Sequence, residues 1–178
     1  MKTQKFEVLP SQSSIAWIGR KVTGEHDGTI GIKDGFLLFS NDRLTGGRFV
    51  IDMQSIKILD VTDPATNAQF ASHLASDDFF SIDQHPDAIF EITAVVGEHV
   101  KGSLTIKGIT NAVGFDADIS HAAGSVTASG KIVVDRTRYN IKFRSGNFFK
   151  DLGDTLIYND FDLQVTITAA TEPATITA

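Results

Sequence analysis

The sequence predicts an all-β protein, built as an extended, antiparallel, eight-stranded β-barrel with one or two short helices in its connections. Apolar and polar residues alternate with a period of two along most of the 178 residues, and turn signals divide this alternation into runs. Successive side chains of a strand point to opposite faces, so each run has one dry and one wet side. Long one-sided strands favour closure into a barrel, which buries the dry faces and removes exposed strand edges.

Eight segments carry the alternation, and several exceed the roughly five to six residues of a common strand. The expected strands span residues 13–22, 27–40, 43–56, 87–97, 99–108, 111–121, 124–135 and 156–170. The clearest case is the last, where the apolar positions are Phe161, Leu163, Val165 and Ile167. Turn signals containing Gly, Asn or Asp separate the segments and predict hairpin connections between neighbours.

Two stretches interrupt the alternation and are expected to be helical. In residues 63–80, Asp63 can cap a helix N-terminus and Pro64 suits the first helical position. One side of this helix follows at helical spacing and consists of Ala68, Ala71, Leu74 and Ala75. A short turn begins at Ser76, and a second short helix is expected over residues 147–154. No repeat or linker divides the chain, so residues 1–178 are expected to form one domain.

Composition and charge argue against several classes of protein. The formal net charge is -6 without a basic cluster, which disfavours nucleic-acid binding and adhesion to an anionic membrane. No run approaches the ~18 apolar residues of a membrane-spanning helix. The residues after Met1 lack the apolar core of a signal peptide, which predicts a cytoplasmic protein. A periplasmic protein whose leader had been removed would begin in the same way.

Motifs for catalysis, cofactors and metals are not found in the sequence. There is no Cys, and the five His include no pair at i, i+2 or i, i+4. No G-x-S-x-G elbow, G-x-G-x-x-G loop or P-loop spacing occurs. Asp116 and Asp118 alternate outward from an expected strand, which favours a solvated face over an acid/base pair. The sequence therefore predicts a protein that is not an enzyme and that has no cofactor and no metal site.

The remaining candidate function depends on the apolar residues. Thirteen Phe stand against two Tyr and one Trp, a composition that suits a dry interior. An eight-stranded barrel is just wide enough either to fill itself with side chains or to hold one small ligand. Composition leaves both alternatives open: a lipid-binding barrel, or a self-filled structural or interaction module. A third reading, an enzyme that acts on a lipid, would need polar groups that converge inside the barrel.

Four segments carry motifs in a consistent order. Residues 14–30 hold a Trp followed, after a gap, by G-x-H-x-G-x-I, and residues 100–110 hold G-x-L-T-x-x-G-x-T. Residues 47–53 and 73–90 lie between them. Together these segments resemble the YceI family of lipocalin-like, polyisoprenoid-binding proteins over most of the chain. One departure lies in residues 135–141, where Asn140 replaces the glycine of the family's pattern.

The resemblance implies a lipocalin-like barrel with an apolar tunnel, often a homodimer, which carries or stores a long-chain isoprenoid lipid or quinone. The carried-over motif positions are His26, His73, Phe79 and Phe80. A head group is expected at the barrel mouth near Arg20, Lys21 or Arg138. The candidate ligand-binding residues are Trp17, Phe36, Phe49, Ile51, Leu74, Phe79, Phe80, Phe90, Leu104, Ile106, Phe115 and Phe143.

Overall fold

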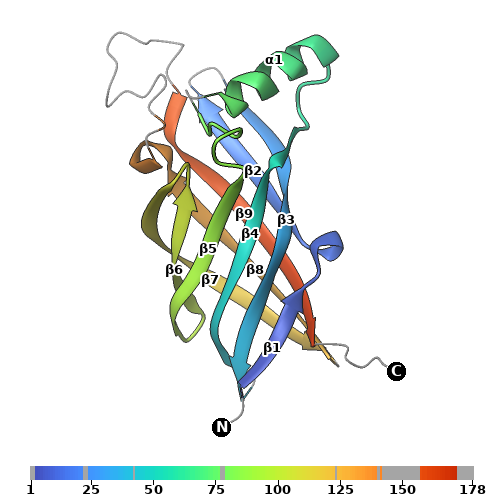
Figure 1. Ribbon diagram of the computed structural model, residues 1–178, viewed down its shortest axis with the longest axis vertical. Helices are drawn as coiled ribbons and strands as arrows, with labels where there is room; N and C mark the ends of the chain where they lie inside the picture. The colour runs from blue at the N-terminus through green and yellow to red at the C-terminus, as the bar shows by residue number, and fades with distance from the viewer. Residues whose placement is uncertain are drawn as a thin grey trace.

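The structure, a computed structural model, describes residues 3–21, 24–41, 43–76, 79–122, 124–139, 141 and 157–171. Within these ranges the chain forms strands, one α-helix and two 3-10 turns (Figure 1). The strands are β1 (Thr3–Val8), β2 (Ser14–Lys21), β3 (Gly24–Ser40), β4 (Arg43–Ile58), β5 (Asp87–Val96), β6 (His99–Ile106), β7 (Ile109–Ala122), β8 (Ser125–Asp135) and β9 (Ile157–Thr171). The helices are η1 (Pro10–Gln12), α1 (Pro64–Ala75) and η2 (Arg136–Tyr139).

The strands close into an antiparallel barrel, as the sequence predicted. The sheet order is β1-β3-β2-β9-β8-β7-β6-β5-β4, and pairing of β3 with β4 joins the two ends. Strands β2 to β9 make the eight-stranded barrel, and β1 is an additional strand. Both β1 and β2 lie between β3 and β9: β2 pairs with the first part of β3, and β1 pairs with its last part. The chain thus fills one position of the barrel with two short strands in succession.

The eight predicted strands correspond to β2–β9, with differences of a few residues at their ends. β7 begins at Ile109, earlier than predicted, because Lys107 and Gly108 alone form the turn, with φ values of 56° and 76°. Positive φ at both central residues is the geometry of a tight two-residue hairpin. The additional strand β1 was not predicted. It holds only two buried residues, Phe6 and Val8, and its partners are distant in sequence.

Helix α1 begins as the sequence predicted. The Asp63 carboxylate accepts a hydrogen bond from the backbone N–H of Thr66 at 3.0 Å, and Pro64 occupies the first turn. The predicted buried side was partly wrong, because Ala68 is exposed. Leu74 is buried and Ala71 and Ala75 pack against the core, as predicted. Phe70, which was not predicted, packs there as well, since its large apolar side chain buries more surface. The predicted helix at 147–154 lies outside the described residues.

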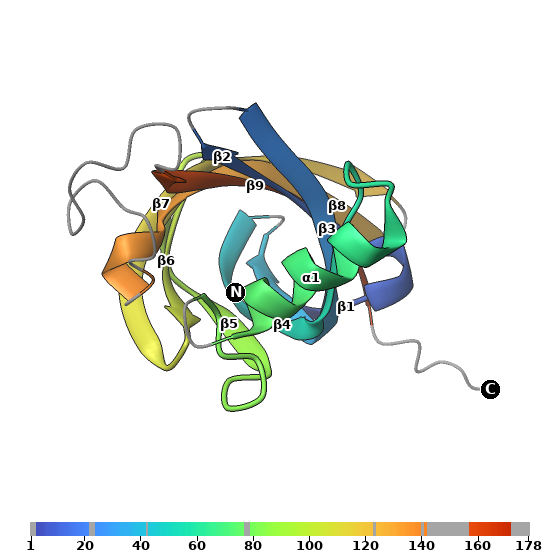
Figure 2. The same ribbon diagram turned by 90° about the horizontal axis from the view of Figure 1, so that it is seen from above.

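Helix α1 lies across one end of the barrel (Figure 2). The Asn67 side-chain amide holds it to the end of β4 by donating to the carbonyl oxygens of Ile58 at 2.9 Å and Val61 at 3.0 Å. We call this the α1 end and the opposite end, where β1 pairs with β3 and β9, the β1 end. After the helix, the backbone N–H of Phe80 donates to the carbonyl oxygen of Leu74 at 3.0 Å, which turns the chain back over the barrel.

Candidate functional site: an apolar pocket beneath helix α1

The α1 end of the barrel contains a cavity of about 160 Å³, which we call the upper pocket. Strands from both sides of the barrel contribute to its wall, because closure brings their dry faces together. The apolar residues that line it are Ile15, Trp17, Ile30, Ile51, Met53, Ile56, Phe70, Leu74, Phe79, Phe80, Ala88, Leu104, Ile106, Ile157, Phe161 and Leu163. Such a wall favours an apolar ligand over a polar one.

Aromatic rings make the roof of the upper pocket. Phe70 comes from α1, and Phe79 and Phe80 come from the turn that follows it. The ring of Phe80 meets that of Phe161 edge to face, with centroids 6.4 Å apart, and Phe79 meets His73 in the same way at 5.0 Å. The roof therefore rests on β9 through ring contacts rather than through backbone pairing.

A polar contact joins β3 to the segment that leads into α1. The Nδ1 atom of His26 lies 2.7 Å from the Asp60 carboxylate, and the backbone N–H of Asp27 donates to the same carboxylate at 3.0 Å. Burial alone would raise the pKa of Asp60, but these hydrogen bonds outweigh it and hold the pKa below its ordinary value. The His26 ring also packs edge to face on Phe70, with centroids 4.7 Å apart. His26 thus contacts both the segment before α1 and the helix itself.

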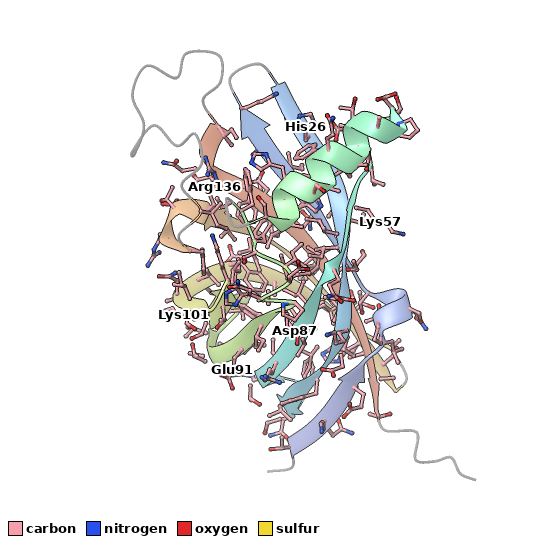
Figure 3. All side chains as sticks on the ribbon, turned by 45° about the horizontal axis from the view of Figure 1, so that its top comes forward. His26, Lys57, Asp87, Glu91, Lys101 and Arg136 are labelled. Carbon is pink, nitrogen blue, oxygen red and sulfur yellow. The ribbon has the colours of Figure 1, made fainter. Side chains whose placement is uncertain are left out.

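The ionisable side chains of the upper pocket gather at the α1 end. Arg20, Lys21, His26, Arg136 and Asp160 all line it, and Figure 3 shows His26 and Arg136 at this end beneath α1. Arg20 donates to the Asp162 carboxylate, which is 10% exposed, at 2.7 Å. The hydrogen bond from Arg20 lowers the pKa of Asp162, with a further contribution from Lys131 at 3.4 Å.

Arg136 is a buried cation beside the pocket. Its guanidinium donates to the carbonyl oxygens of Ile141 at 2.9 Å and Ile157 at 3.0 Å, and it lies 5.9 Å from the Phe79 ring centroid. Burial lowers its pKa to about 10, so the side chain is still charged at neutral pH. The sequence reasoning missed this residue. The signal available was its position in residues 135–141, the segment in which Asn140 departs from the family's pattern.

The sequence matches a protein family over most of its length. A model of the YceI-like domain family matches residues 6–169. The chain belongs to this family. The match begins within β1 and ends within β9, so it includes the barrel, the helix α1 and the residues of the upper pocket.

Solved structures with the same fold include a YceI protein and a polyisoprenoid binding domain. BcnA of Burkholderia cenocepacia superposes with a TM-score of 0.69 at 19% identity, covering 92% of this chain and 99% of that one. A domain of Saccharophagus degradans, described as a polyisoprenoid binding domain, gives 0.67 at 12% identity, covering 96% and 100%. The Campylobacter jejuni YceI protein gives 0.57 at 19% identity, covering 79% and 83%. At these identities the likeness establishes the fold alone.

Curated relatives match a shorter stretch. A UPF0312 protein of Staphylococcus aureus strain N315 is 37% identical over 79 residues, which is 40% of this chain and 46% of that protein. A second, from the bovine strain RF122, is 33% identical over a stretch of the same length. The matched stretch therefore spans about half the length of these relatives.

The structure brings most of the predicted site residues of this YceI-like barrel to one place. Seven of the twelve line the upper pocket: Trp17, Ile51, Leu74, Phe79, Phe80, Leu104 and Ile106. Phe49, Phe90 and Phe115 instead line a smaller cavity of about 30 Å³ towards the β1 end, the lower cavity. Phe36 lies apart from both, on the outer face under the ammonium group of Lys5 at 5.0 Å, and Phe143 lies outside the described residues. Of the head-group candidates, Arg20 and Lys21 line the upper pocket, whereas the exposed Arg138 does not.

Two structural findings bear on other kinds of site. Among the residues that the structure describes, no three His, Cys, Asp or Glu side chains lie close enough together to hold a metal ion. In the same part of the chain, no helix has the length and apolar character needed to span a membrane.

Proposed function

We propose that this protein binds an apolar lipid of isoprenoid type in the upper pocket and carries or stores it without chemical change. The observation that carries the proposal is the pocket itself: a cavity of about 160 Å³ whose wall is apolar and whose charged residues gather at one end. Support also comes from the family, since a related solved structure is described as a polyisoprenoid binding domain.

The energetics favour a hydrocarbon ligand. Burial of a methylene group contributes about 0.8 kcal/mol, so an isoprene unit of five carbons contributes up to roughly 4 kcal/mol. Fixing the complex and ordering the tail offset a good part of this gain. Because the tail supplies the affinity, an isoprenoid can bind firmly with few polar contacts, which agrees with the small number of polar groups in the wall.

The charged end of the pocket suits a polar head group. Arg20 and Lys21 lie at this end, and the buried Arg136 adds a positive charge beside the Phe79 ring. A quinone carbonyl or a prenyl phosphate could accept hydrogen bonds from these donors while the tail points towards the barrel centre. We therefore place the head group beneath α1 and the tail below it.

The self-filled barrel is the main alternative function class. It requires large side chains that meet at the centre and leave no continuous cavity. A cavity that can hold one water needs only about 10–15 Å³, so the upper pocket is roughly ten times larger than that limit. An apolar space of this size favours ligand binding over self-filling.

Native mass spectrometry of the freshly purified protein, followed by solvent extraction, tests the proposal. We expect a co-purified apolar lipid, or uptake of a prenol or quinone that is added to the apoprotein. The same spectrum reports whether the protein is a homodimer. An apoprotein that takes up neither class of lipid would contradict the proposed function and favour an interaction module.

A further inference from the structure

Three phenylalanine rings form a layer across the middle of the barrel. Phe49, Phe90 and Phe115 come from β4, β5 and β7, with ring centroids 5.2 Å apart for Phe49–Phe90 and 5.9 Å apart for Phe90–Phe115. Phe90 is 1% exposed and Phe49 is 3% exposed. We call these three rings the phenylalanine layer. Contacts at these distances are those of packed aromatic pairs.

The layer lies on the boundary between the two cavities. On β5, Ala88 lines the upper pocket, and Phe90, the next inward residue, lines the lower cavity. On β4, Ile51 lines the upper pocket and Phe49 the lower cavity. Ile51 pairs with Ala88, and Phe49 pairs with Phe90, across the two strands. Both strands therefore pass from the upper pocket to the lower cavity at the same level of the barrel.

The backbone is shaped to hold two of these rings. A Cβ atom on Gly102 of β6 would lie 2.5 Å from Cζ of Phe90, and one on Gly130 of β8 would lie 2.5 Å from Cδ2 of Phe115. Each ring therefore lies directly over a glycine of the neighbouring strand, in space that any other residue would fill. This arrangement fixes the rings in position across the barrel.

The rings have little space into which they could move. The lower cavity is only about 30 Å³, and it is already lined by all three rings. Protein interiors are close-packed, so a ring pushed down by a ligand would have to displace the side chains below it. The layer therefore acts as a floor beneath the upper pocket rather than as a gate.

We infer that the phenylalanine layer sets the length of isoprenoid tail that the protein encloses. The inference rests on the proposed function and deepens it. A cavity of about 150 Å³ in another protein binds benzene, a molecule of six carbons. The upper pocket, at about 160 Å³, has room for a tail of about one to two isoprene units above the floor. Further units of a longer tail would remain outside and add little affinity.

A series of prenols of increasing length tests the inference. Trp17, the single Trp of the chain, lines the upper pocket, so its fluorescence reports binding there. In the wild type, we expect geraniol, with two isoprene units, to bind at least about tenfold more tightly than a prenol with one unit. Farnesol and geranylgeraniol, with three and four units, should bind within about threefold of geraniol.

Substitution of the floor should change this profile. Phe90→Ala joins the two cavities, and we expect affinity to keep rising to farnesol and beyond. Phe90→Leu is a milder variant that keeps the inference testable if Phe90→Ala does not fold. Phe39→Ala is the matched control, because Phe39 is also 1% exposed but lines neither cavity. The control should keep the wild-type profile.

The outcomes separate the two claims. A wild-type affinity that rises steadily from geraniol to geranylgeraniol would overturn the floor, although isoprenoid binding would stand. A Phe90 variant that folds and keeps the wild-type profile would also overturn it. Failure of every prenol to bind the wild type would overturn the proposed function, and the inference with it.

Discussion

The two ends of the barrel use the same strand pattern but enclose different amounts of space. Towards the α1 end, Ala88 and Gly19 keep the wall thin and leave a pocket of about 160 Å³. Towards the β1 end, the phenylalanine layer lines a free space of only about 30 Å³, and the edge-to-face pair Phe6–Phe39, with centroids 5.2 Å apart, is buried. The alternation of apolar and polar residues decides which side chains point inward. The size of the inward side chains at each level of the barrel decides whether a pocket remains or the interior is filled.

The two ends are also closed by different means. Helix α1 covers one end through side-chain contacts, chiefly those of Asn67, Phe70 and Leu74. At the other end, β1 completes the wall by backbone pairing with β3 and β9, and the buried rings of Phe6 and Phe39 fill the interior. Backbone pairing is extended and cooperative, whereas a few side-chain contacts can open locally at lower cost. A ligand would therefore enter more easily at the α1 end.

The largest predicted difference between the two ends concerns stability. Phe90→Ala removes a fully buried ring and should lower the free energy of unfolding by about 3–5 kcal/mol. Phe80→Ala removes a half-buried ring that already borders the upper pocket, so it should cost less than about 2 kcal/mol. Urea denaturation of both variants checks the order. Equal losses would mean that the two ends are packed alike.

The buried arginine should also contribute strongly. Arg136→Met keeps an apolar stem but leaves the carbonyl oxygens of Ile141 and Ile157 without these donors, so we expect a loss of about 2–3 kcal/mol. Arg138→Met is the control, since Arg138 is exposed and its replacement should change stability by less than about 0.5 kcal/mol. Similar effects from both would contradict a structural role for Arg136.

The ion pair of Arg20 with Asp162 gives a pH-dependent prediction. The hydrogen bond from Arg20 lowers the pKa of Asp162 from its ordinary value of 3.8. The ion pair therefore stabilises the fold above pH 3.8, and this stabilisation is lost as the pH falls through the lowered pKa. Asp162→Asn should therefore cost about 1 kcal/mol at pH 7, and the difference from the wild type should shrink below about pH 4. Denaturation at several pH values measures it. If the stability difference between Asp162→Asn and the wild type stayed constant at acidic pH, the ion pair would not be its source.

The smallest expected effect concerns Trp17. Its indole nitrogen is buried and has no hydrogen-bond partner in the described part of the chain. An unpaired buried donor is unfavourable, so Trp17→Phe should cost little, within about 1 kcal/mol, despite the loss of ring area. Thermal denaturation measures this. A much larger loss would indicate that the indole makes a stabilising contact that the structure does not contain.

Much of this architecture could be predicted from the sequence because alternation is a local property. The inward positions Leu163, Val165 and Ile167 were predicted from spacing alone, and they are buried. Phe36 and Phe39 are three residues apart, so in a regular strand they face opposite sides. That spacing could have distinguished the outward Phe36 from the inward Phe39 in advance. Phe79 and Phe80 were found only through the motif, since no periodicity places a turn above a pocket.

The position of the floor could not be predicted. It depends on the strand register that sets Phe49 opposite Phe90. It also depends on Gly102 and Gly130, which lie under the rings of Phe90 and Phe115, and no sequence pattern indicates these contacts between strands. Arg136 was missed for a different reason. Arginine is rarely buried, so a sequence pattern assigns it to the surface unless the carbonyl groups that receive it are known.

The most direct test of the account is to fill each cavity in turn and measure geraniol binding by Trp17 fluorescence. Ala88 lines the upper pocket and Ala117 the lower cavity, and both are buried strand residues, 2% and 5% exposed. We predict that Ala88→Leu weakens binding at least about tenfold, because it occupies the space of the tail, whereas Ala117→Leu leaves the affinity unchanged. Unchanged binding by a folded Ala88→Leu variant, or a loss seen only with Ala117→Leu, would contradict a ligand site beneath α1.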